Sequence, residues 1–83
     1  MYFVYALYNK KFDKIYVGQT ENLEKRLTLH EEKTFKNSFT SRFDGHWDLI
    51  YSEHLTTRRE ALRREKQLKS FRGREFIKKY IPA

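Results

Sequence analysis

The chain has 83 residues with a net charge of +7, and 39% of them are hydrophobic, which is enough for one small domain around a single core. It contains no cysteine, which excludes disulfide bonds and metal sites built from thiolates. No segment is long and apolar enough for a membrane span or a secretory signal, so residues 1–83 are expected to form a single cytoplasmic domain with no membrane partner.

Two strands are predicted near the N-terminus, over residues 2–8 and 14–19, because both segments are rich in β-branched and aromatic residues. Residues 9–13 between them are polar and short enough for a hairpin. The first strand is apolar or aromatic on both of its faces, which predicts that both faces are covered. Gly18, near the end of the second strand, would let another backbone or a ligand approach closely.

A helix is predicted to begin after these strands, at Thr20 or Asn22, because either side chain can cap it. Arg26 and His30 are four residues apart on this helix, so they share one face. Residues 34–46 have no clear period and are predicted to form a long loop. The helix therefore presents one arginine and one histidine side by side.

A third strand is predicted over residues 47–53, followed by a long helix over residues 57–72 with Thr57 in its capping box. Gly73 is expected to end this helix, and residues 74–80 are expected to form a short final one. The order is strand, strand, helix, strand, helix, helix. This order predicts an α+β fold in which helices flank a small three-stranded antiparallel sheet.

Glu65 lies on the side of the long helix that should face the core. The apolar stripe on that side consists of four residues: Ala61, Leu62, Leu68 and Phe71. At about 100° per residue, Glu65 falls inside this stripe. Burying an unpaired carboxylate would cost several kcal/mol, so Glu65 needs a cation, hydrogen-bond partners or a water-filled cleft. A metal held beside a bound polyanion would meet this need, and an ion pair with Arg26 is the best alternative.

The positive charge is concentrated in the last third of the chain. Residues 1–55 carry eight basic and eight acidic side chains, whereas residues 56–83 carry ten basic and three acidic ones. Such asymmetry is typical of a surface that faces nucleic acid, although a solvated helix would have the same composition. The side chains expected to bind nucleic acid are Arg63, Arg64, Lys66, Lys69 and Arg72.

Several side chains could together perform phosphodiester chemistry. Tyr5 and Tyr16 lie on strands expected to be adjacent, so their phenols could point into one cleft. A tyrosine near a cation loses its proton more readily and can then take one from water. Arg26 could neutralise charge on a phosphate oxygen, and Glu65 would suit Mg²⁺, which keeps several of its waters. Together these groups would make a metal-assisted phosphodiester hydrolase.

The order of these residues resembles that of the GIY-YIG endonucleases, most closely their small stand-alone bacterial members. The two signature motifs appear as Phe3-Val4-Tyr5 and Tyr16-Val17-Gly18. Residues 18–30 are similar to the family's helix with a catalytic arginine. Residues 59–69 are similar to the segment with its metal-binding glutamate, and residues 47–51 also match. Phe3 departs from the family, since it replaces the glycine of the first motif.

The resemblance implies a role for each matched residue. Tyr5 and Tyr16 would be the motif tyrosines, one of which helps to activate the attacking water. Arg26 would contact the scissile phosphate, and Glu65 would bind Mg²⁺ or Mn²⁺. His30 would be a proton relay or a phosphate ligand. The packing glycine of the second motif would be Gly18.

The activity implied by this resemblance is hydrolysis of DNA by an endonuclease that acts on structured or damaged DNA, such as branched or nicked duplexes, as in DNA repair. An unidentified protein would recruit it to that DNA. Two alternatives stay open at this point. One is a non-catalytic nucleic-acid-binding module with the same fold. The other is a protein-interaction domain in which Arg26 and Glu65 form only a structural ion pair.

Overall fold

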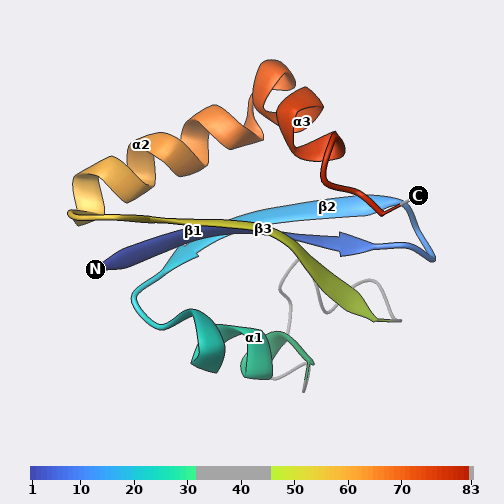
Figure 1. Cartoon of the computed structure of the whole chain (residues 1–83), viewed down its shortest axis with the longest axis horizontal. Coiled ribbons are helices and arrows are strands. Elements are labelled where there is room, and N and C mark those ends of the chain that lie inside the picture. Colours follow the sequence, from blue (N-terminus) through green and yellow to red (C-terminus); the bar gives the residue numbers. More distant parts are fainter. Residues whose placement is uncertain (32–45, 83) are drawn as a thin grey trace.

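The computed structural model describes residues 1–31 and 46–82, which form one antiparallel sheet with helices on both of its faces (Figure 1). The elements are β1 (Tyr2–Asn9), β2 (Lys14–Thr20), α1 (Leu23–Glu31), β3 (Trp47–Leu55), α2 (Arg58–Lys69) and α3 (Phe71–Lys78). The predicted α+β fold and its order of elements are confirmed. The predicted loop over residues 34–46 lies outside the described residues, except for its last residue.

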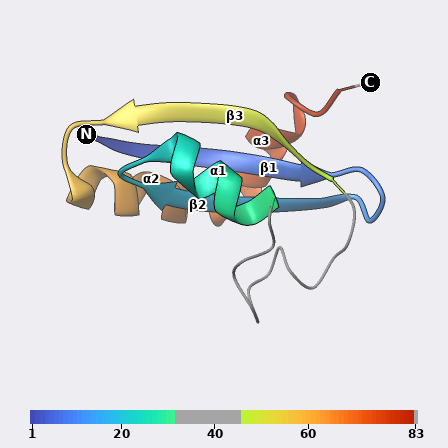
Figure 2. The same cartoon turned by 90° about the horizontal axis from the view of Figure 1, so that it is seen from below.

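The sheet has the strand order β2-β1-β3, so β1 is central and β2 forms one edge. Both neighbours of β1 run antiparallel to it, and Tyr5 lies opposite Gly18 of β2. Helices α2 and α3 cover one face of the sheet and α1 lies on the other (Figures 1 and 2). Because β1 is covered on both faces, Val4, Tyr5, Ala6 and Leu7 are all buried, as their apolar pattern predicts.

The hydrophobic core lies between the sheet and helices α2 and α3. It is formed by alternate residues of the strands and by a few helical positions: Val4, Ala6, Val17, Ala61, Leu68 and Ile77. Successive residues of a strand point to opposite faces, so Tyr5 points away from the face on which Val4 and Ala6 pack. Among the described residues, no helix is long and apolar enough to cross a membrane.

Helix α1 is capped by Asn22 and helix α2 by Thr57. The Asn22 carboxamide oxygen accepts a hydrogen bond from the Lys25 N–H at 3.0 Å, which decides between the two predicted caps. The Thr57 hydroxyl accepts from the Glu60 N–H at 3.2 Å and donates to the Glu60 carboxylate at 3.1 Å. The predicted cap by Thr57 is therefore confirmed, whereas the Glu60 carboxylate returns to the Thr57 hydroxyl and not to the backbone N–H of a capping box.

The predicted end of the long helix at Gly73 is wrong, because the helix ends at Lys69 and a new one starts at Phe71. Ser70 between them is extended, and its hydroxyl accepts from the Gly73 N–H at 3.2 Å. Gly73 instead lies buried inside α3, where a Cβ atom would collide with the backbone of Gln67 and Leu68. It therefore allows the two helices to meet closely.

The predicted core stripe of α2 is correct for Ala61 and Leu68 and wrong for the other two residues. Leu62 is 46% exposed and Phe71 is 79% exposed. Leu62 is rotated by about 100° from Ala61, and the small sheet covers only a narrow side of the helix. Phe71 lies beyond the break at Ser70, so the periodicity of α2 no longer applies to it.

Candidate active site

Tyr5 and Tyr16 lie side by side on β1 and β2, with ring centroids 6.1 Å apart and planes inclined by 48°. Gly18 makes room for both rings. A Cβ atom at this position would lie 2.9 Å from the Tyr5 hydroxyl oxygen and 3.0 Å from Tyr16 Cε2. The prediction that the two tyrosines lie together beside Gly18 is therefore confirmed.

Replacing Gly18 with alanine is expected to displace these rings, because the new Cβ atom would lie too close to both of them and the Tyr5 ring is buried. We expect a loss of about 1–3 kcal/mol in the free energy of unfolding, as for other overpacked sites. Urea denaturation measures this loss. The matched control is Gln19→Ala on the same strand, which should cost less than Gly18→Ala; equal costs would contradict the packing role.

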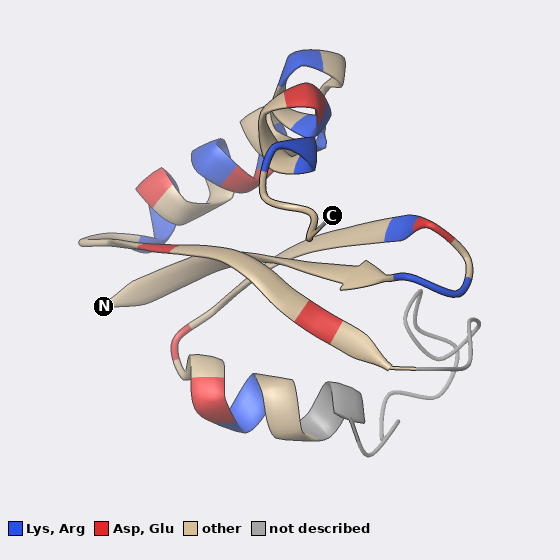
Figure 3. Cartoon of the chain, turned by 45° about the vertical axis from the view of Figure 1, so that its right-hand side comes forward, with Lys and Arg blue, Asp and Glu red and all other residues tan. Residues whose placement is uncertain are grey.

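Arg26 belongs to α1 and Glu65 to α2, two helices on opposite faces of the sheet (Figure 1), and both helices carry blue basic and red acidic residues in Figure 3. Both side chains act electrostatically on the Tyr5 phenol, Arg26 lowering its pKa and Glu65 raising it. Tyr16 also raises that pKa. The structure thus brings together four of the five catalytic residues predicted from the sequence. The fifth, His30, lies in the last turn of α1, but its side chain is outside the described part of the structure.

Burial raises the pKa of Tyr5 well above its ordinary value, and the charge and hydrogen bond of Tyr16 raise it further. Arg26 opposes these effects without cancelling them. The Tyr5 phenol is therefore protonated at neutral pH and can donate a hydrogen bond. Tyr16 is only partly buried, so it is better placed than Tyr5 to meet solvent.

The raised pKa of Tyr5 predicts an alkaline loss of stability. Because the pKa is higher in the folded protein than in the unfolded chain, the stabilising contribution is complete below pH ~10 and is lost above it. The loss from Tyr5 approaches about 1.4 kcal/mol per pH unit. Urea denaturation at several pH values should show that Tyr5→Phe is less sensitive than wild type above pH ~10. Parallel curves for the two proteins would refute this assignment.

Glu65 is partly buried, with 20% of its side chain exposed, and its carboxylate lies 2.7 Å from the Lys69 ammonium group. The position of Glu65 in the apolar stripe predicts that its carboxylate needs a cation. Lys69, one turn further along the helix, provides one. The described residues contain no cluster of three His, Asp or Glu side chains. Glu65 supplies one partly buried carboxylate, and Mg²⁺ is an ion that can bind through one or two carboxylates while keeping several waters.

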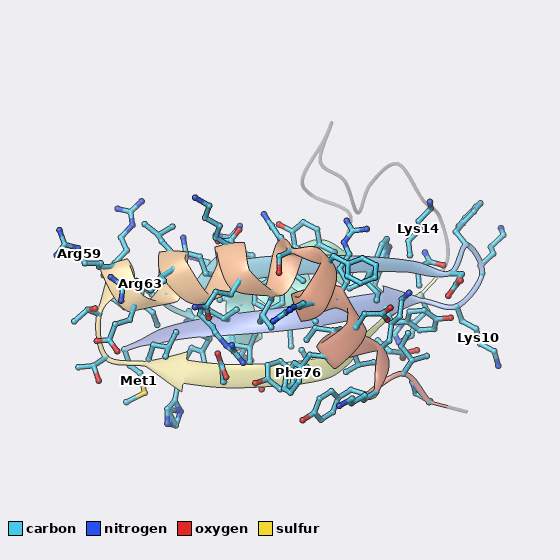
Figure 4. The ribbon with its side chains drawn as sticks, turned by 90° about the horizontal axis from the view of Figure 1, so that it is seen from above. Met1, Lys10, Lys14, Arg59, Arg63 and Phe76 are labelled. Atoms are coloured by element: carbon cyan, nitrogen blue, oxygen red, sulfur yellow. The ribbon has the colours of Figure 1, made fainter. Side chains whose placement is uncertain are left out.

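The basic residues of α2 and α3 fall into two groups. Four of the five predicted to bind nucleic acid line an open groove of about 730 Å³: Arg63, Arg64, Lys66 and Arg72. Within it, Arg64 donates to the Glu53 carboxylate and lies 5.6 Å from the Phe76 ring centre. The Phe76 ring contacts Tyr51 of β3, so this part of the groove lies toward β3 (Figure 4).

The fifth basic residue, Lys69, lies on the other side of the helices. Together with Ile15, Tyr16, Val17 and Arg74 it lines a pocket of about 220 Å³ beside the edge strand β2. Arg74 was not among the predicted site residues, because the turn at Ser70 is needed to bring α3 back toward β2. Its place in a basic segment directly after Gly73 was the available signal.

Tyr5 and Tyr16 lie on neighbouring strands of this small α+β domain, and Arg26 and Glu65 lie on the helices over its two faces. Comparison with known families shows which class of protein has these features. The model of the GIY-YIG catalytic domain matches residues 1–80. The chain therefore belongs to the GIY-YIG family, as its motifs predict. Membership implies a nuclease-type function with DNA as the substrate, and nucleases of this family generally depend on a divalent metal.

A solved structure supports the same family and fold. The chain is similar to the UPF0213 protein BH0048 from Bacillus halodurans, whose structure was determined by solution NMR. The sequence identity is 28% and the TM-score is 0.54, and the match covers 93% of this chain and 82% of that one. No match was found among curated proteins. The predicted resemblance to small single-domain GIY-YIG proteins is thus confirmed.

Proposed function

We propose that the protein is a divalent-metal-dependent endonuclease that hydrolyses a DNA phosphodiester bond at the β2 edge of its sheet. The observation that carries this proposal is the packing of the Tyr5 and Tyr16 rings beside Gly18, with Arg26 and Glu65 near enough to act electrostatically on the Tyr5 phenol. These groups come from four different elements, so their meeting depends on the whole fold. A cation, a carboxylate and a phenol pair are the parts that such a hydrolysis needs.

Each residue has a distinct part in the proposed reaction. Tyr16, which is partly exposed, releases its own proton to solvent and as a phenolate takes the proton of the attacking water. The protonated Tyr5 donates a hydrogen bond that orients the Tyr16 oxygen. Arg26 stabilises the charge that develops on the phosphate oxygens. Glu65 holds Mg²⁺ or Mn²⁺, which when bound supplies Lewis-acid stabilisation of the phosphate. His30 is assigned as a proton relay or phosphate ligand on the same helix as Arg26.

The proposed substrate is structured or damaged DNA, such as a branched or nicked duplex met in DNA repair. Five side chains are proposed to contact its phosphates: Arg63, Arg64, Lys66, Lys69 and Arg72. The uneven charge of the chain supports this assignment, since ten of its eighteen basic residues lie in residues 56–83. An unidentified partner protein is proposed to recruit the domain to such DNA.

A non-catalytic nucleic-acid-binding module is the second candidate. The ion pair between Glu65 and Lys69 favours it, because the ammonium group already neutralises the proposed metal ligand. In such a module the pair would persist when DNA is bound. The surface charge would then provide affinity without hydrolysis.

One panel of labelled DNA substrates tests both candidates. The purified protein is incubated with branched, nicked, intact and single-stranded DNA, with Mg²⁺, with Mn²⁺ or with EDTA. Metal-dependent cutting of branched or nicked DNA, above that of intact duplex, is the expected result. Salt-sensitive binding without any cutting would instead establish the binding module. Neither binding nor cutting would refute both.

A further inference from the structure

Two neighbouring pockets lie along the β2 edge. The first, of about 220 Å³, lies beside Tyr16. The second, of about 720 Å³, is lined by Asp13, Lys14, Ile15, Arg74, Lys78 and Ile81. Because Ile15 and Arg74 line both pockets, the second pocket lies between the first and the hairpin that joins β1 and β2. We call the two pockets together the β2 groove.

The β2 groove is strongly basic. Four cations line it, Lys14, Lys69, Arg74 and Lys78, against the single carboxylate of Asp13. Asp13 accepts a hydrogen bond from the Tyr8 hydroxyl at 2.8 Å, so its charge is partly satisfied within the hairpin. The groove therefore favours a ligand with several negative charges in a row.

Two of these cations form ion pairs with carboxylates. Lys69 pairs with Glu65 and Lys78 pairs with Glu75 at 3.6 Å, and more than half of each lysine side chain is exposed. The pair of Lys78 with Glu75 is exposed on both sides, and pairs of this kind contribute about 0–1 kcal/mol, so little is lost when a phosphate replaces the Glu75 carboxylate.

The other basic groove, between α2 and α3, does not reach the catalytic tyrosines. None of the residues that line it also lines the pocket beside Tyr16. The labelled side chains show the separation, since Phe76 lies over β3 whereas Lys14 lies at the hairpin end of β2 (Figure 4). The pocket beside Tyr16 therefore belongs to the β2 groove and not to the groove between α2 and α3.

We propose that the DNA strand to be cut lies along the β2 groove, with its sugar–phosphate backbone running from Tyr16 past Lys69 and Arg74 to Lys78 and Lys14. This inference rests on the proposed function and extends it by assigning the path of the substrate. The pocket beside Tyr16, of about 220 Å³, is small, so we assign to it the backbone of the single strand that is cut. DNA beyond the cut strand would be contacted by the basic residues of the groove between α2 and α3, which are Arg63, Arg64, Lys66 and Arg72.

The test is the salt dependence of binding to a fluorescent single-stranded oligothymidine, measured by anisotropy in EDTA so that no cutting occurs. Each phosphate contact to a single strand contributes about 0.7 to the slope of log K against log[salt]. Removing two contacts with Lys14→Ala/Lys78→Ala should therefore reduce the slope by about 1.4. These side chains lie outside the catalytic cluster and on the surface, so their removal leaves the core intact.

The matched control is Arg58→Ala/Arg59→Ala, which removes two exposed cations at the far end of α2 and should leave the slope unchanged. Circular dichroism checks that the variants fold, and Lys14→Gln/Lys78→Gln replaces the alanine pair if that pair unfolds. An unchanged slope for the Lys14/Lys78 pair, an equal loss in the control, or no binding by wild type would overturn the inference. DNA cleavage is measured separately in Mg²⁺. A reduced slope without cleavage would reject only the proposed nuclease activity. Cleavage with an unchanged slope would reject only the proposed path of the strand.

Discussion

Replacing Arg26 with alanine is expected to lower the single-turnover rate of DNA cleavage by about 10²–10³-fold, the usual cost of losing one preorganised charge-stabilising group. Arg26 comes from α1 and lies near enough to Tyr5 to lower its pKa. Its guanidinium group carries a permanent charge and can make two parallel hydrogen bonds to a phosphate. Without it, charge on the scissile phosphate would lose its main partner on this face of the sheet.

Rates at saturating enzyme separate this effect from weaker binding. Arg26→Lys keeps the charge but loses the forked geometry, so we expect it to recover only part of the rate. Lys25→Ala, next to it on α1, is the matched control and should cut nearly as fast as wild type. Wild-type rates for Arg26→Ala would remove this residue from the proposed mechanism.

Replacing Glu65 with glutamine is expected to reduce metal-dependent cleavage by about 10³-fold or more, since Lewis-acid stabilisation of a phosphate contributes several kcal/mol. Glutamine has the same shape but no charge, so it cannot hold Mg²⁺ as a carboxylate does. The loss of the partly exposed pair with Lys69 should change the free energy of unfolding by only about 1 kcal/mol or less. Activity and stability are thus expected to respond very differently.

A Mg²⁺ titration and a urea denaturation of the same variant distinguish the two roles of Glu65. Glu75→Gln is the matched control, because Glu75 is also paired with a lysine but lies on the exposed side of α3. A large loss of stability with unchanged cleavage would show that Glu65 is only a structural partner of Lys69.

The strands and the tyrosine pair could be predicted because their signals are local. A short polar link between two β-branched segments specifies a hairpin, and the hairpin places Tyr5 and Tyr16 on neighbouring strands. Thr57 likewise acts on residues within one helical turn. Interactions between residues so close in the chain can be predicted from the sequence alone.

The break in the C-terminal helix was not predictable in the same way. Ser70 and Gly73 are both able to end a helix, and sequence alone favoured the glycine. The structure shows that Ser70 ends α2, while Gly73 serves a contact between helices. A glycine required by a neighbouring backbone has the same sequence signal as one required by a turn.

The surroundings of Glu65 depend on contacts between elements far apart in the chain. Its place in an apolar stripe indicated an unusual carboxylate, but the stripe was narrower than expected, and Leu62 is exposed. Arg74 reaches the pocket beside Tyr16 only because α3 folds back over the sheet. The periodicity of α2 cannot predict that a residue of α3 reaches this pocket.

The most direct test of the proposed active site is one cleavage experiment with wild type, Glu65→Gln and Glu75→Gln, on a nicked or branched DNA, with Mg²⁺ and with EDTA. We expect wild type and Glu75→Gln to cut at similar rates in Mg²⁺ only, and Glu65→Gln to cut at least about 10³-fold more slowly. Equal cutting by all three proteins, or cutting by wild type in EDTA, would contradict a metal-dependent site at Glu65.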